Sequence, residues 1–232
     1  MIPILFEDNH CLVVNKPAGL LAQGDITGDE SLVDIAKTYL KTTYAKPGEV
    51  YLGLVHRLDR QTSGVILLAR TSKAAGRLSE QFRRGEIEKT YWAIVEGSLE
   101  GDDGSFHDYL RKDPETNHVE ALDGPAPGAV EAILDYKVID RAGRKSWLEL
   151  RPRTGRSHQL RVQLASRGLP IFGDRKYGAT SVLGASDGGY RIALHARALK
   201  FSHPTKKEPV ECSAPLWPDW PRWEGRAMDL PI

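Results

Sequence analysis

Short apolar runs of strand-forming residues recur along the chain, whereas only a few stretches show helical spacing. Runs rich in β-branched and aromatic residues and bounded by turn residues predict strands at 4–6, 11–15, 65–69, 90–95, 130–139, 146–150 and 192–199. The first two runs are separated by a short polar segment and predict a hairpin. Residues 97–127 are rich in Gly, Pro, Asp and Asn, so we expect turns and short irregular strands there.

Three stretches predict helices. The first is expected to be capped by Ser31, and its apolar positions follow helical spacing: Leu32, Ile35, Ala36 and Leu40. The second is expected to be capped by Ser72 and to end at Gly85, with the inward-facing positions Ala75, Leu78 and Phe82. The third covers 156–167.

Strands therefore outnumber helices and do not alternate with them regularly. This pattern is typical of α+β proteins and not of doubly wound βαβ folds. We expect an extended mixed, mostly antiparallel sheet with flanking helices. No repeat and no linker is visible, so we predict a single domain over 1–232.

The composition is that of a soluble globular protein, with 41% hydrophobic and 27% charged residues. The N-terminal residues lack the features of a signal peptide, and no apolar run is long enough to span a membrane. We expect a cytoplasmic protein with no membrane association. The two cysteines, Cys11 and Cys212, form neither a disulfide framework nor a zinc-ligand pattern, and the apolar run around Cys11 predicts a buried, reduced thiol.

The charge is distributed unevenly although the formal net charge is only +1. Between residues 141 and 176 there are ten basic residues and two acidic ones. This distribution indicates one basic face for a partner with local negative charge. Composition alone would favour the simpler interpretation of a solvated charged surface.

The first chemically informative segment is the turn at 56–64, which leads into the apolar run 65–69. It places Asp59 between Arg57 and Arg60, whose positive charges favour an ionised carboxylate. One carboxylate for chemistry with arginines for phosphate contacts suits an RNA site. Taken alone, the same residues are more often a turn aspartate in a weak surface ion pair.

Two more segments carry residues suited to RNA. Strand alternation places Lys89 and Tyr91 on one face, where a ring beside a cation can stack on a base, although a strand tyrosine is more often part of a core. The helix at 156–167 holds Arg161 on a rigid element anchored by leucines, with Thr154 or Gly155 expected at its N-cap. The alternative for this segment is an amphipathic helix with a basic outer face.

Together these segments resemble the RluA-type pseudouridine synthases. The signature His-Arg-Leu-Asp-x-x-Thr-Ser-Gly stands complete at 56–64, and the Lys-x-Tyr strand stands at 89–91. The Gly-Arg-Ser/Thr-His-Gln-Leu/Ile-Arg helix is matched at 155–161, and Pro-Ile-x-Gly-Asp-x-x-Tyr-Gly at 170–178. The opening Asn-Lys-Pro-Ala-Gly-Leu at 15–20 is similar as well. These motifs occur in the family's order, which a chance match does not explain.

The resemblance implies an enzyme that isomerises specific uridines in structured rRNA or tRNA to pseudouridine. It implies that Asp59 is the catalytic carboxylate, that Arg161 pairs with it, and that Tyr91 stacks on the target base and assists proton removal. The implied fold is a mostly antiparallel mixed sheet with a central cleft. We assign RNA binding to Arg57, which would enter the RNA stack, and to four further residues: Arg60, Lys89, Arg156 and His158.

The implied reaction breaks the bond from C1′ to N1 of uracil, rotates the base and joins C1′ to C5. Water must be excluded, and the uridine must be flipped out of a duplex at a cost of about a few kcal/mol. Asp59 could attack C1′, attack the base or remove a proton from the sugar, and the residues favour none of the three. No cofactor and no metal is required. We expect a monomer.

Departures from the family pattern are small. Gln163 and Leu169 stand where the family often has histidine, and we expect them to affect substrate fit at most. The N-terminal S4 module of many relatives is not expected, so RNA contacts must come from the catalytic domain. The tryptophans of the 217–232 tail, Trp217, Trp220 and Trp223, are interpreted as packing residues and not as a base platform.

Two other functions compete with this one. A catalytically inactive RNA-binding protein of the same fold would be favoured by an altered aspartate turn, and here the turn is complete. An unrelated glycoside or nucleoside hydrolase with two carboxylates would release free uracil or sugar, which a chromatographic assay detects.

Overall fold

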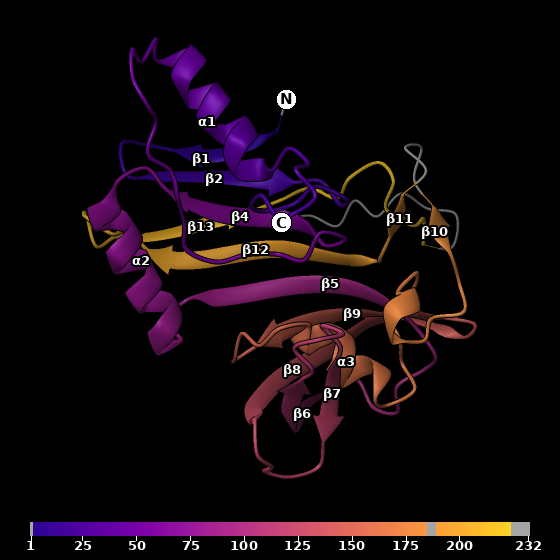
Figure 1. Cartoon of the computed structure of the whole chain (residues 1–232). Coiled ribbons are helices and arrows are strands. Elements are labelled where there is room, and N and C mark those ends of the chain that lie inside the picture. Colours follow the sequence, from indigo (N-terminus) through magenta and orange to yellow (C-terminus); the bar gives the residue numbers. More distant parts are fainter. Residues whose placement is uncertain (1, 185–188, 224–232) are drawn as a thin grey trace. The chain divides into compact units, whose positions relative to one another are not determined.

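The computed structural model describes residues 2–184 and 189–223, and the chain forms two compact units. The first unit consists of the residues up to Lys89 together with Ala196–Pro218, and the second consists of Thr90–His195 and the segment that follows Pro218 (Figure 1). Both units combine segments that are far apart in the sequence, which is why no linker separates them along the chain. A single domain over 1–232 stays a prediction.

The first unit is built on strands in the order β1–β2–β4–β12, with β3 beside β4 and β13 beside β12. Their bounds are β1 Ile4–Glu7, β2 Cys11–Lys16, β3 Gly53–Leu54, β4 Ser63–Ala69, β12 Leu194–Ser202 and β13 Pro209–Ser213. The pairs β1–β2, β2–β4, β3–β4 and β12–β13 are antiparallel, and the predicted N-terminal hairpin is confirmed. Strands β2 and β4 are buried at every position, so both consist mainly of continuous apolar runs.

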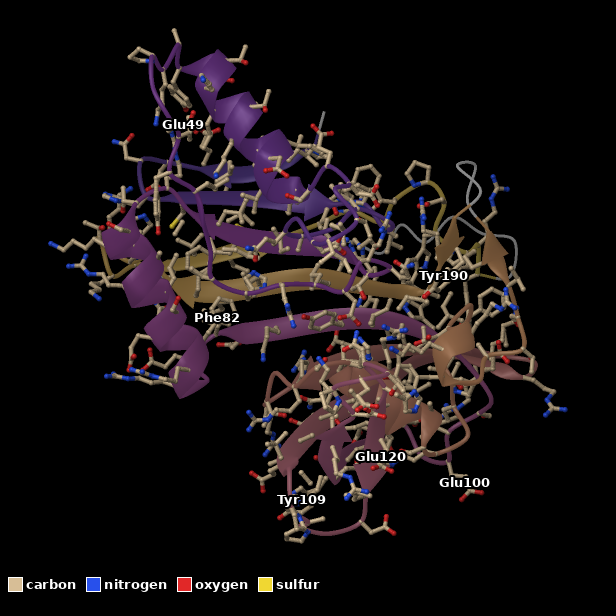
Figure 2. All side chains as sticks on the ribbon, viewed as in Figure 1. Glu49, Phe82, Glu100, Tyr109, Glu120 and Tyr190 are labelled. Atoms are coloured by element: carbon tan, nitrogen blue, oxygen red, sulfur yellow. The ribbon has the colours of Figure 1, made fainter. Side chains whose placement is uncertain are left out.

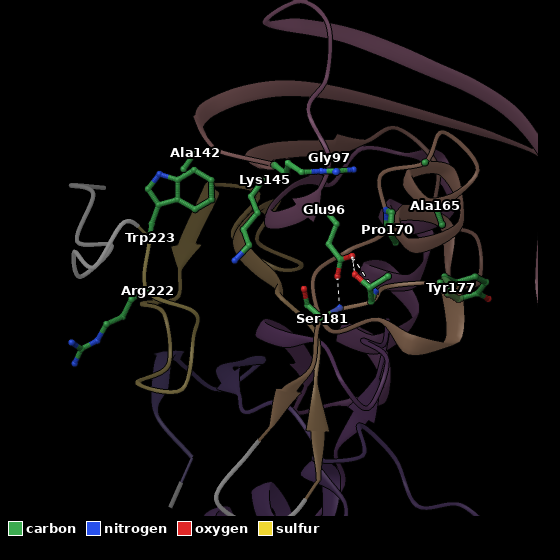
Figure 3. A pocket seen from close by; sticks show the side chains of 14 residues that line it. Glu96, Gly97, Ala142, Lys145, Ala165, Pro170, Tyr177, Ser181, Arg222 and Trp223 are labelled. Atoms are coloured by element: carbon green, nitrogen blue, oxygen red, sulfur yellow. Dashed lines mark hydrogen bonds between the residues drawn. The ribbon is translucent and has the colours of Figure 1, made fainter.

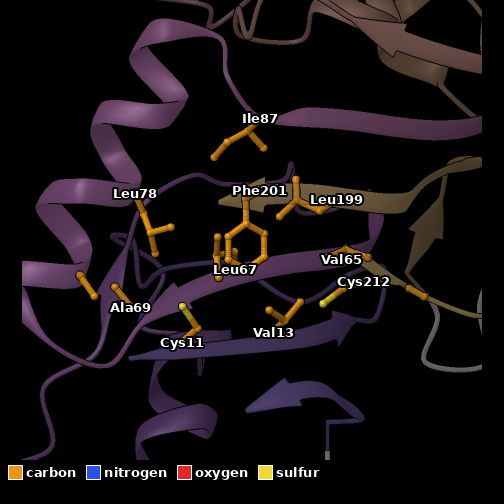
Figure 4. Packing of buried hydrophobic residues seen from close by; sticks show 12 residues of the cluster. Cys11, Val13, Val65, Leu67, Ala69, Leu78, Ile87, Leu199, Phe201 and Cys212 are labelled. Atoms are coloured by element: carbon orange, nitrogen blue, oxygen red, sulfur yellow. The ribbon is translucent and has the colours of Figure 1, made fainter. Parts of the chain in front are cut away.

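The core of this unit lies between these strands and helix α2 (Ser72–Arg84). Figure 4 shows side chains from β2, β4, α2, β12 and β13 meeting in one cluster, among them Val13, Leu67, Leu78, Phe201 and both cysteines. Burial raises the pKa of Cys11 to about 12 and that of Cys212 to about 11, so both are protonated thiols at neutral pH. The predicted buried, reduced Cys11 is confirmed.

The two helices of this unit largely follow the sequence prediction. Helix α1 (Leu32–Thr43) is capped by Ser31, whose hydroxyl accepts from the Asp34 amide while the Asp34 carboxylate accepts from the Ser31 amide. The predicted cap of α2 at Ser72 is wrong: Thr71 has the extended backbone and accepts from the Ala74 amide, and Ser72 is already helical. The helix ends at Gly85 as predicted, in a left-handed conformation.

The second unit contains a sheet in the order β5–β9–β8–β6–β7, in which all neighbouring strands are antiparallel. The bounds are β5 Glu88–Glu96, β6 Asp103–Lys112, β7 Val119–Leu122, β8 Ala129–Ala142 and β9 Lys145–Pro152. Glu120 and Tyr109 mark the β6–β7 hairpin in Figure 2.

The prediction of short irregular strands for 97–127 is wrong for β6. This strand has ten residues and pairs with β8 from Asp103 to Arg111. Phe106, Asp108 and Leu110 alternate with exposed or half-buried neighbours. Because the buried position 108 is an aspartate, the sequence lacks the regular apolar alternation that predicts a strand.

The rest of the second unit consists of short elements. Helix α3 covers Gln159–Ala165, the 3-10 helix η1 covers Arg175–Tyr177, and β10 (Leu183–Gly184) pairs with β11 (Tyr190–Arg191). The third predicted helix is therefore present but much shorter than 156–167.

The packing interpretation is confirmed for Trp223, which is buried, and it stays a prediction for Trp217 and Trp220, which are half-buried. The Trp217 indole N–H donates to Asn15 Oδ1 (2.9 Å), the Trp223 indole N–H donates to Asp140 Oδ2 (2.8 Å), and the Trp220 ring lies edge-on to His195. The remainder of the tail, 224–232, lies outside the described residues. Among the helices of the described residues, none is long and apolar enough to cross a membrane.

Candidate active site

The first unit holds the predicted catalytic aspartate in a tight turn. The Asp59 carbonyl accepts from the Thr62 amide (3.0 Å), which places Arg60 and Gln61 at the corner of the turn. Leu58, Thr62 and Ser63 are buried, while Asp59 is half-buried. The turn is therefore anchored on both sides of the aspartate.

The Lys16 side chain links the loop at 17–20 to this turn. Its side chain is fully buried, and its ammonium donates to the carbonyls of Pro17 (3.0 Å), Leu20 (2.8 Å) and Arg60 (3.2 Å). The Gly19 amide also donates to the Arg60 carbonyl (2.7 Å). A buried ammonium requires hydrogen-bond partners, and here carbonyls of the turn and the loop provide them. The sequence analysis missed this role, although a lysine that ends an apolar run is a signal for it.

Gly64 lets strand β4 approach β12 closely. Its φ is +114°, and an added Cβ would overlap the backbone of Ala196. A glycine is therefore required at the end of the aspartate turn.

His56 anchors the other end of the turn. The Leu67 amide donates to His56 Nε2 (2.8 Å), and the imidazole stacks on Phe82 with ring centroids 4.6 Å apart. Phe82 lies on α2 (Figure 2). Burial, and to a smaller extent the positive charge of Lys89, lowers the pKa of His56 to about 3. The ring is therefore a neutral acceptor with a structural role.

The arginines beside Asp59 differ in their surroundings. Arg57 is exposed. Arg60 donates from Nε to the Gly19 carbonyl (2.9 Å) and forms an ion pair with Asp29 (2.9 Å). Arg60 thus holds the loop in addition to any contact with RNA. The RNA-binding roles of Arg57, Arg60 and Lys89 stay predictions.

In the second unit, Arg161 is held by a carboxylate that the sequence analysis did not assign. Its Nε donates to Asp174 Oδ2 (2.6 Å) and its Nη2 donates to Asp174 Oδ1 (2.8 Å). The side chains are 5% and 0% exposed, so the pair is buried. A bidentate pair fixes the plane of the guanidinium. The sequence contained a signal for this pair, because Asp174 is one of only two acidic residues in the basic stretch 141–176.

Tyr177 and His158 complete the surroundings of Arg161. The Arg161 guanidinium lies 5.0 Å from the centre of the Tyr177 ring. The Tyr177 hydroxyl contacts His158 Nδ1 at 2.6 Å and accepts from the Val119 amide at 3.3 Å. The predicted RNA-binding His158 therefore has a structural contact, and its RNA role stays a prediction.

The expected N-cap at Thr154 or Gly155 is wrong. His158 occupies the cap position in a left-handed conformation (φ 51°). The Gln159 side chain accepts from the Arg156 amide (3.0 Å) and the Thr154 hydroxyl (2.8 Å), so these residues form a turn and not a helix. The exposed Arg156 donates from Nε to the Glu131 carbonyl (2.9 Å), and its RNA role stays a prediction.

The alternative of an amphipathic helix with a basic outer face is also wrong, because all residues of 159–164 are buried. Gln163 is fully buried, and its amide donates to the carboxylate of Asp108 (2.7 Å). Leu169 is buried as well. Both residues pack inside the second unit, and the expectation that they affect substrate fit at most stays a prediction.

Asp59 and its expected partners lie in different units. Asp59 belongs to the first unit, whereas Tyr91 and Arg161 belong to the second. Tyr91 stands in β5 opposite Leu150 and is half-buried. The pairing of Asp59 with Arg161, the stacking role of Tyr91 and the central cleft stay predictions.

A second cluster of titratable groups in the first unit consists of Asp8, Cys11 and His203. The amides of Thr205 and Lys206 donate to His203 Nδ1, so the ring proton lies on Nε2 and is donated to Asp8 Oδ2 (2.7 Å). The thiol of Cys11 is protonated. These bonds fasten the β1–β2 turn to the β12–β13 turn.

Comparisons with known proteins identify the family of the chain. Residues 10–166 match the family model described as RNA pseudouridylate synthase, and the chain belongs to this family. It is 37% identical, over 92% of its length, to an uncharacterized RNA pseudouridine synthase of Zymomonas mobilis, of which it covers 93%. It is also 37% identical to the ribosomal large subunit pseudouridine synthase D of Xanthomonas campestris, and 32% identical to the synthase C of Vibrio vulnificus.

The chain spans about two thirds of the length of these two ribosomal relatives, 67% and 65%, while 94% and 92% of its own length is aligned. Among solved structures, the human RNA pseudouridylate synthase domain containing 4 protein has a TM-score of 0.77 and 26% identity, over 93% of this chain and 89% of that one. The predicted fold class, α+β with a mostly antiparallel sheet and few helices, is confirmed, as is the family resemblance.

Proposed function

We propose that this chain isomerises specific uridines to pseudouridine in rRNA or tRNA. The observation that supports the proposal most directly is the complete aspartate turn at 56–64, which lies within the matched residues 10–166. Buried anchors on both sides hold that turn. A buried lysine and a required glycine around one half-buried carboxylate serve to fix its position, as catalysis needs.

In this reaction the bond from C1′ to N1 breaks, the uracil rotates, a bond from C1′ to C5 forms, and the proton on C5 moves to N1. Atoms and electrons balance without an added reactant. Asp59 is the catalytic carboxylate, Arg161 orients it, and Tyr91 contacts the base. The Asp174 carboxylate and the Tyr177 ring fix the Arg161 guanidinium, so Arg161 does not need to reorganise during the reaction.

The proposal extends to the setting of the enzyme. The chain works as a monomeric, cytoplasmic catalytic domain that binds RNA through its own residues. The names of the Xanthomonas and Vibrio relatives make large-subunit rRNA the first substrate to test. Mapping pseudouridines in total RNA from cells with and without the gene identifies the RNA and the uridine.

The decisive variant is Asp59→Asn, which retains the shape of the side chain and removes its charge. We expect pseudouridine formation to fall below detection, while thermal unfolding and RNA affinity stay close to wild type. The matched control is Asp123→Asn, an exposed aspartate in the second unit, which should retain full activity. Nucleoside chromatography of digested RNA is the measurement.

The same assay distinguishes the competing functions. Normal pseudouridine yield in Asp59→Asn would refute the assignment of the carboxylate. RNA binding without any product in the wild type would indicate an inactive RNA-binding protein. Free uracil among the products would indicate a hydrolase.

A further inference from the structure

The second unit contains a cavity of about 880 Å³. Its walls include Glu96, Lys145, Pro170, Tyr177, Ser181 and Trp223 (Figure 3). The volume lies within the range of about 300–1,000 Å³ that is usual for ligand sites. None of the predicted catalytic residues lines this cavity, so the proposed isomerisation assigns it no role.

Positive charge predominates on the walls. Among the described residues that line the cavity, Arg144, Lys145 and Arg222 are basic, and Glu96 is the single carboxylate. Among the described residues none of these three cations forms an ion pair. By contrast, five other arginines of the basic stretch are each paired with a carboxylate: Arg141, Arg151, Arg153, Arg161 and Arg167. Arg144 and Lys145 therefore differ from these five arginines, because both line the cavity and form no ion pair with a described residue.

The β8–β9 turn holds two of the cations in place. The Arg144 carbonyl accepts from the Gly97 amide (2.8 Å), and the Ser146 hydroxyl donates to the Gly97 carbonyl (3.1 Å). The Lys145 ammonium lies 4.4 Å from the centre of the Phe172 ring, a cation–π contact that orders it. Figure 3 shows Lys145 directed into the cavity between Trp223 and Glu96.

The wall beside Lys145 is polar and ordered by Glu96, which is paired with Lys145 in the β5–β9 ladder. Its carboxylate accepts from the Thr180 amide (3.0 Å), the Thr180 hydroxyl (2.7 Å) and the Ser181 amide (2.8 Å). Burial would raise the pKa of Glu96, but these hydrogen bonds outweigh it and hold the pKa below its usual range. This wall therefore combines an ionised carboxylate with hydroxyl groups, which suits the 2′-hydroxyl of a ribose better than a second phosphate.

The aromatic walls do not offer a platform for a base. Trp223 is only 6% exposed, and its indole is fixed by Asp140 and by the Trp147 ring. The Arg161 guanidinium lies over the Tyr177 ring, and Tyr177 borders the cavity as well. The cavity is thus suited to sugar and phosphate, and it adjoins the surroundings of Arg161.

We propose that this cavity binds the sugar–phosphate backbone of the substrate RNA at nucleotides other than the isomerised uridine. The inference rests on the proposed function, because it takes RNA as the ligand. Phosphates contact Arg144, Lys145 and Arg222, and ribose hydroxyls face Glu96 and Ser181. The contacts do not depend on the base sequence.

The test measures binding of a fluorescent twelve-nucleotide oligouridylate by anisotropy at several salt concentrations. The double variant Arg144→Glu with Lys145→Glu should bind about tenfold more weakly, and the slope of log affinity against log salt should fall by about two. The matched control reverses two exposed lysines of the same unit that do not line the cavity, Lys112→Glu with Lys137→Glu. It has the same net charge and should change the affinity less than about threefold.

Equal losses in both double variants would overturn the proposal, because they would indicate only long-range electrostatics. Unchanged binding in the cavity variant would overturn it as well. Thermal unfolding of each variant shows that the fold is retained. If the wild type forms pseudouridine and the cavity variant binds normally, only this inference fails. If the wild type forms none but the cavity variant loses binding, the proposed function fails and the RNA subsite stands.

Discussion

The imidazole of His56 joins the aspartate turn to strand β4 by accepting a hydrogen bond from the Leu67 amide. This contact requires the neutral ring, and the pKa of about 3 keeps it neutral in the folded protein. The signature histidine of the turn is therefore a structural acceptor, and the carboxylate of Asp59 is left as the group suited to chemistry.

The histidine makes stability depend on pH in a defined direction. In the unfolded chain His56 titrates near its ordinary pKa of 6.5, whereas in the folded chain it titrates near 3. Well above pH 6.5 the imidazole is neutral in both states, so His56 adds no pH dependence there. As the pH falls from 6.5 toward 3, the unfolded state binds the proton first, and stability decreases by at most about 1.4 kcal/mol per pH unit.

His56→Gln should remove this dependence, because the amide oxygen of glutamine can accept the Leu67 hydrogen bond without titrating. Urea unfolding at pH 7 and pH 5 measures the difference. We expect the wild type to lose more stability than the variant over this interval. Equal losses would contradict the assignment of a buried neutral imidazole.

At the same scale, the sequence identified some site residues and missed others. Asp59, Tyr91 and Arg161 were assigned because the family resemblance implies a catalytic role for each, whereas Lys16 and Asp174 lie in matched motifs for which no residue role was inferred. Lys16 and Asp174 were missed because their roles depend on contacts distant in sequence: the Lys16 ammonium reaches the carbonyl of Arg60, and Asp174 reaches Arg161. Neither contact has a periodic signature.

Among the elements, α3 differs most from its prediction. A helix over 156–167 was predicted, with an amphipathic helix with a basic outer face as the alternative, but the observed helix is short and buried on all sides. Its arginine is buried because the following turn and η1 bring Asp174 to it. The strength of that buried pair decides how rigidly Arg161 is held.

We therefore expect Asp174→Asn to reduce the free energy of unfolding by about 3 kcal/mol, since it leaves the buried guanidinium without its carboxylate. Chemical denaturation is the measurement. Asp135→Asn is the matched control: Asp135 and Arg153 also meet at 2.6 Å, but Arg153 is 65% exposed. That change should reduce stability by less than about 1 kcal/mol. Similar effects at both sites would show that burial does not strengthen the Asp174 pair.

For the molecule as a whole, the proposed chemistry assigns roles to residues of both units. Asp59 belongs to the first unit and Arg161 to the second, a hundred residues later in the sequence. The proposed function requires that the two side chains interact.

A double-mutant cycle with Asp59→Asn and Arg161→Gln tests this requirement in the free energy of unfolding. Residues in contact give interaction energies of at least about 0.5 kcal/mol, whereas separate residues are additive. The control cycle combines Asp59→Asn with Arg167→Gln. Arg167 pairs with Asp108. We expect coupling in the first cycle and additivity in the second. Additive effects in both would remove the basis for a shared site.

The sequence by itself determined the family, the fold class and the aspartate turn, because motifs, apolar runs and turn residues are local signals. Most strands and both long helices were predicted for the same reason. Only the tertiary structure decided that Asp174 pairs with Arg161 and that the Lys16 ammonium binds carbonyls of the loop 17–20 and of the aspartate turn. It also decided which basic residues at the cavity form no ion pair with a described residue. Those outcomes depend on burial and on contacts between segments distant in sequence. Whether a charged side chain forms an internal ion pair or stays accessible to a ligand is decided only when folding brings its neighbours together.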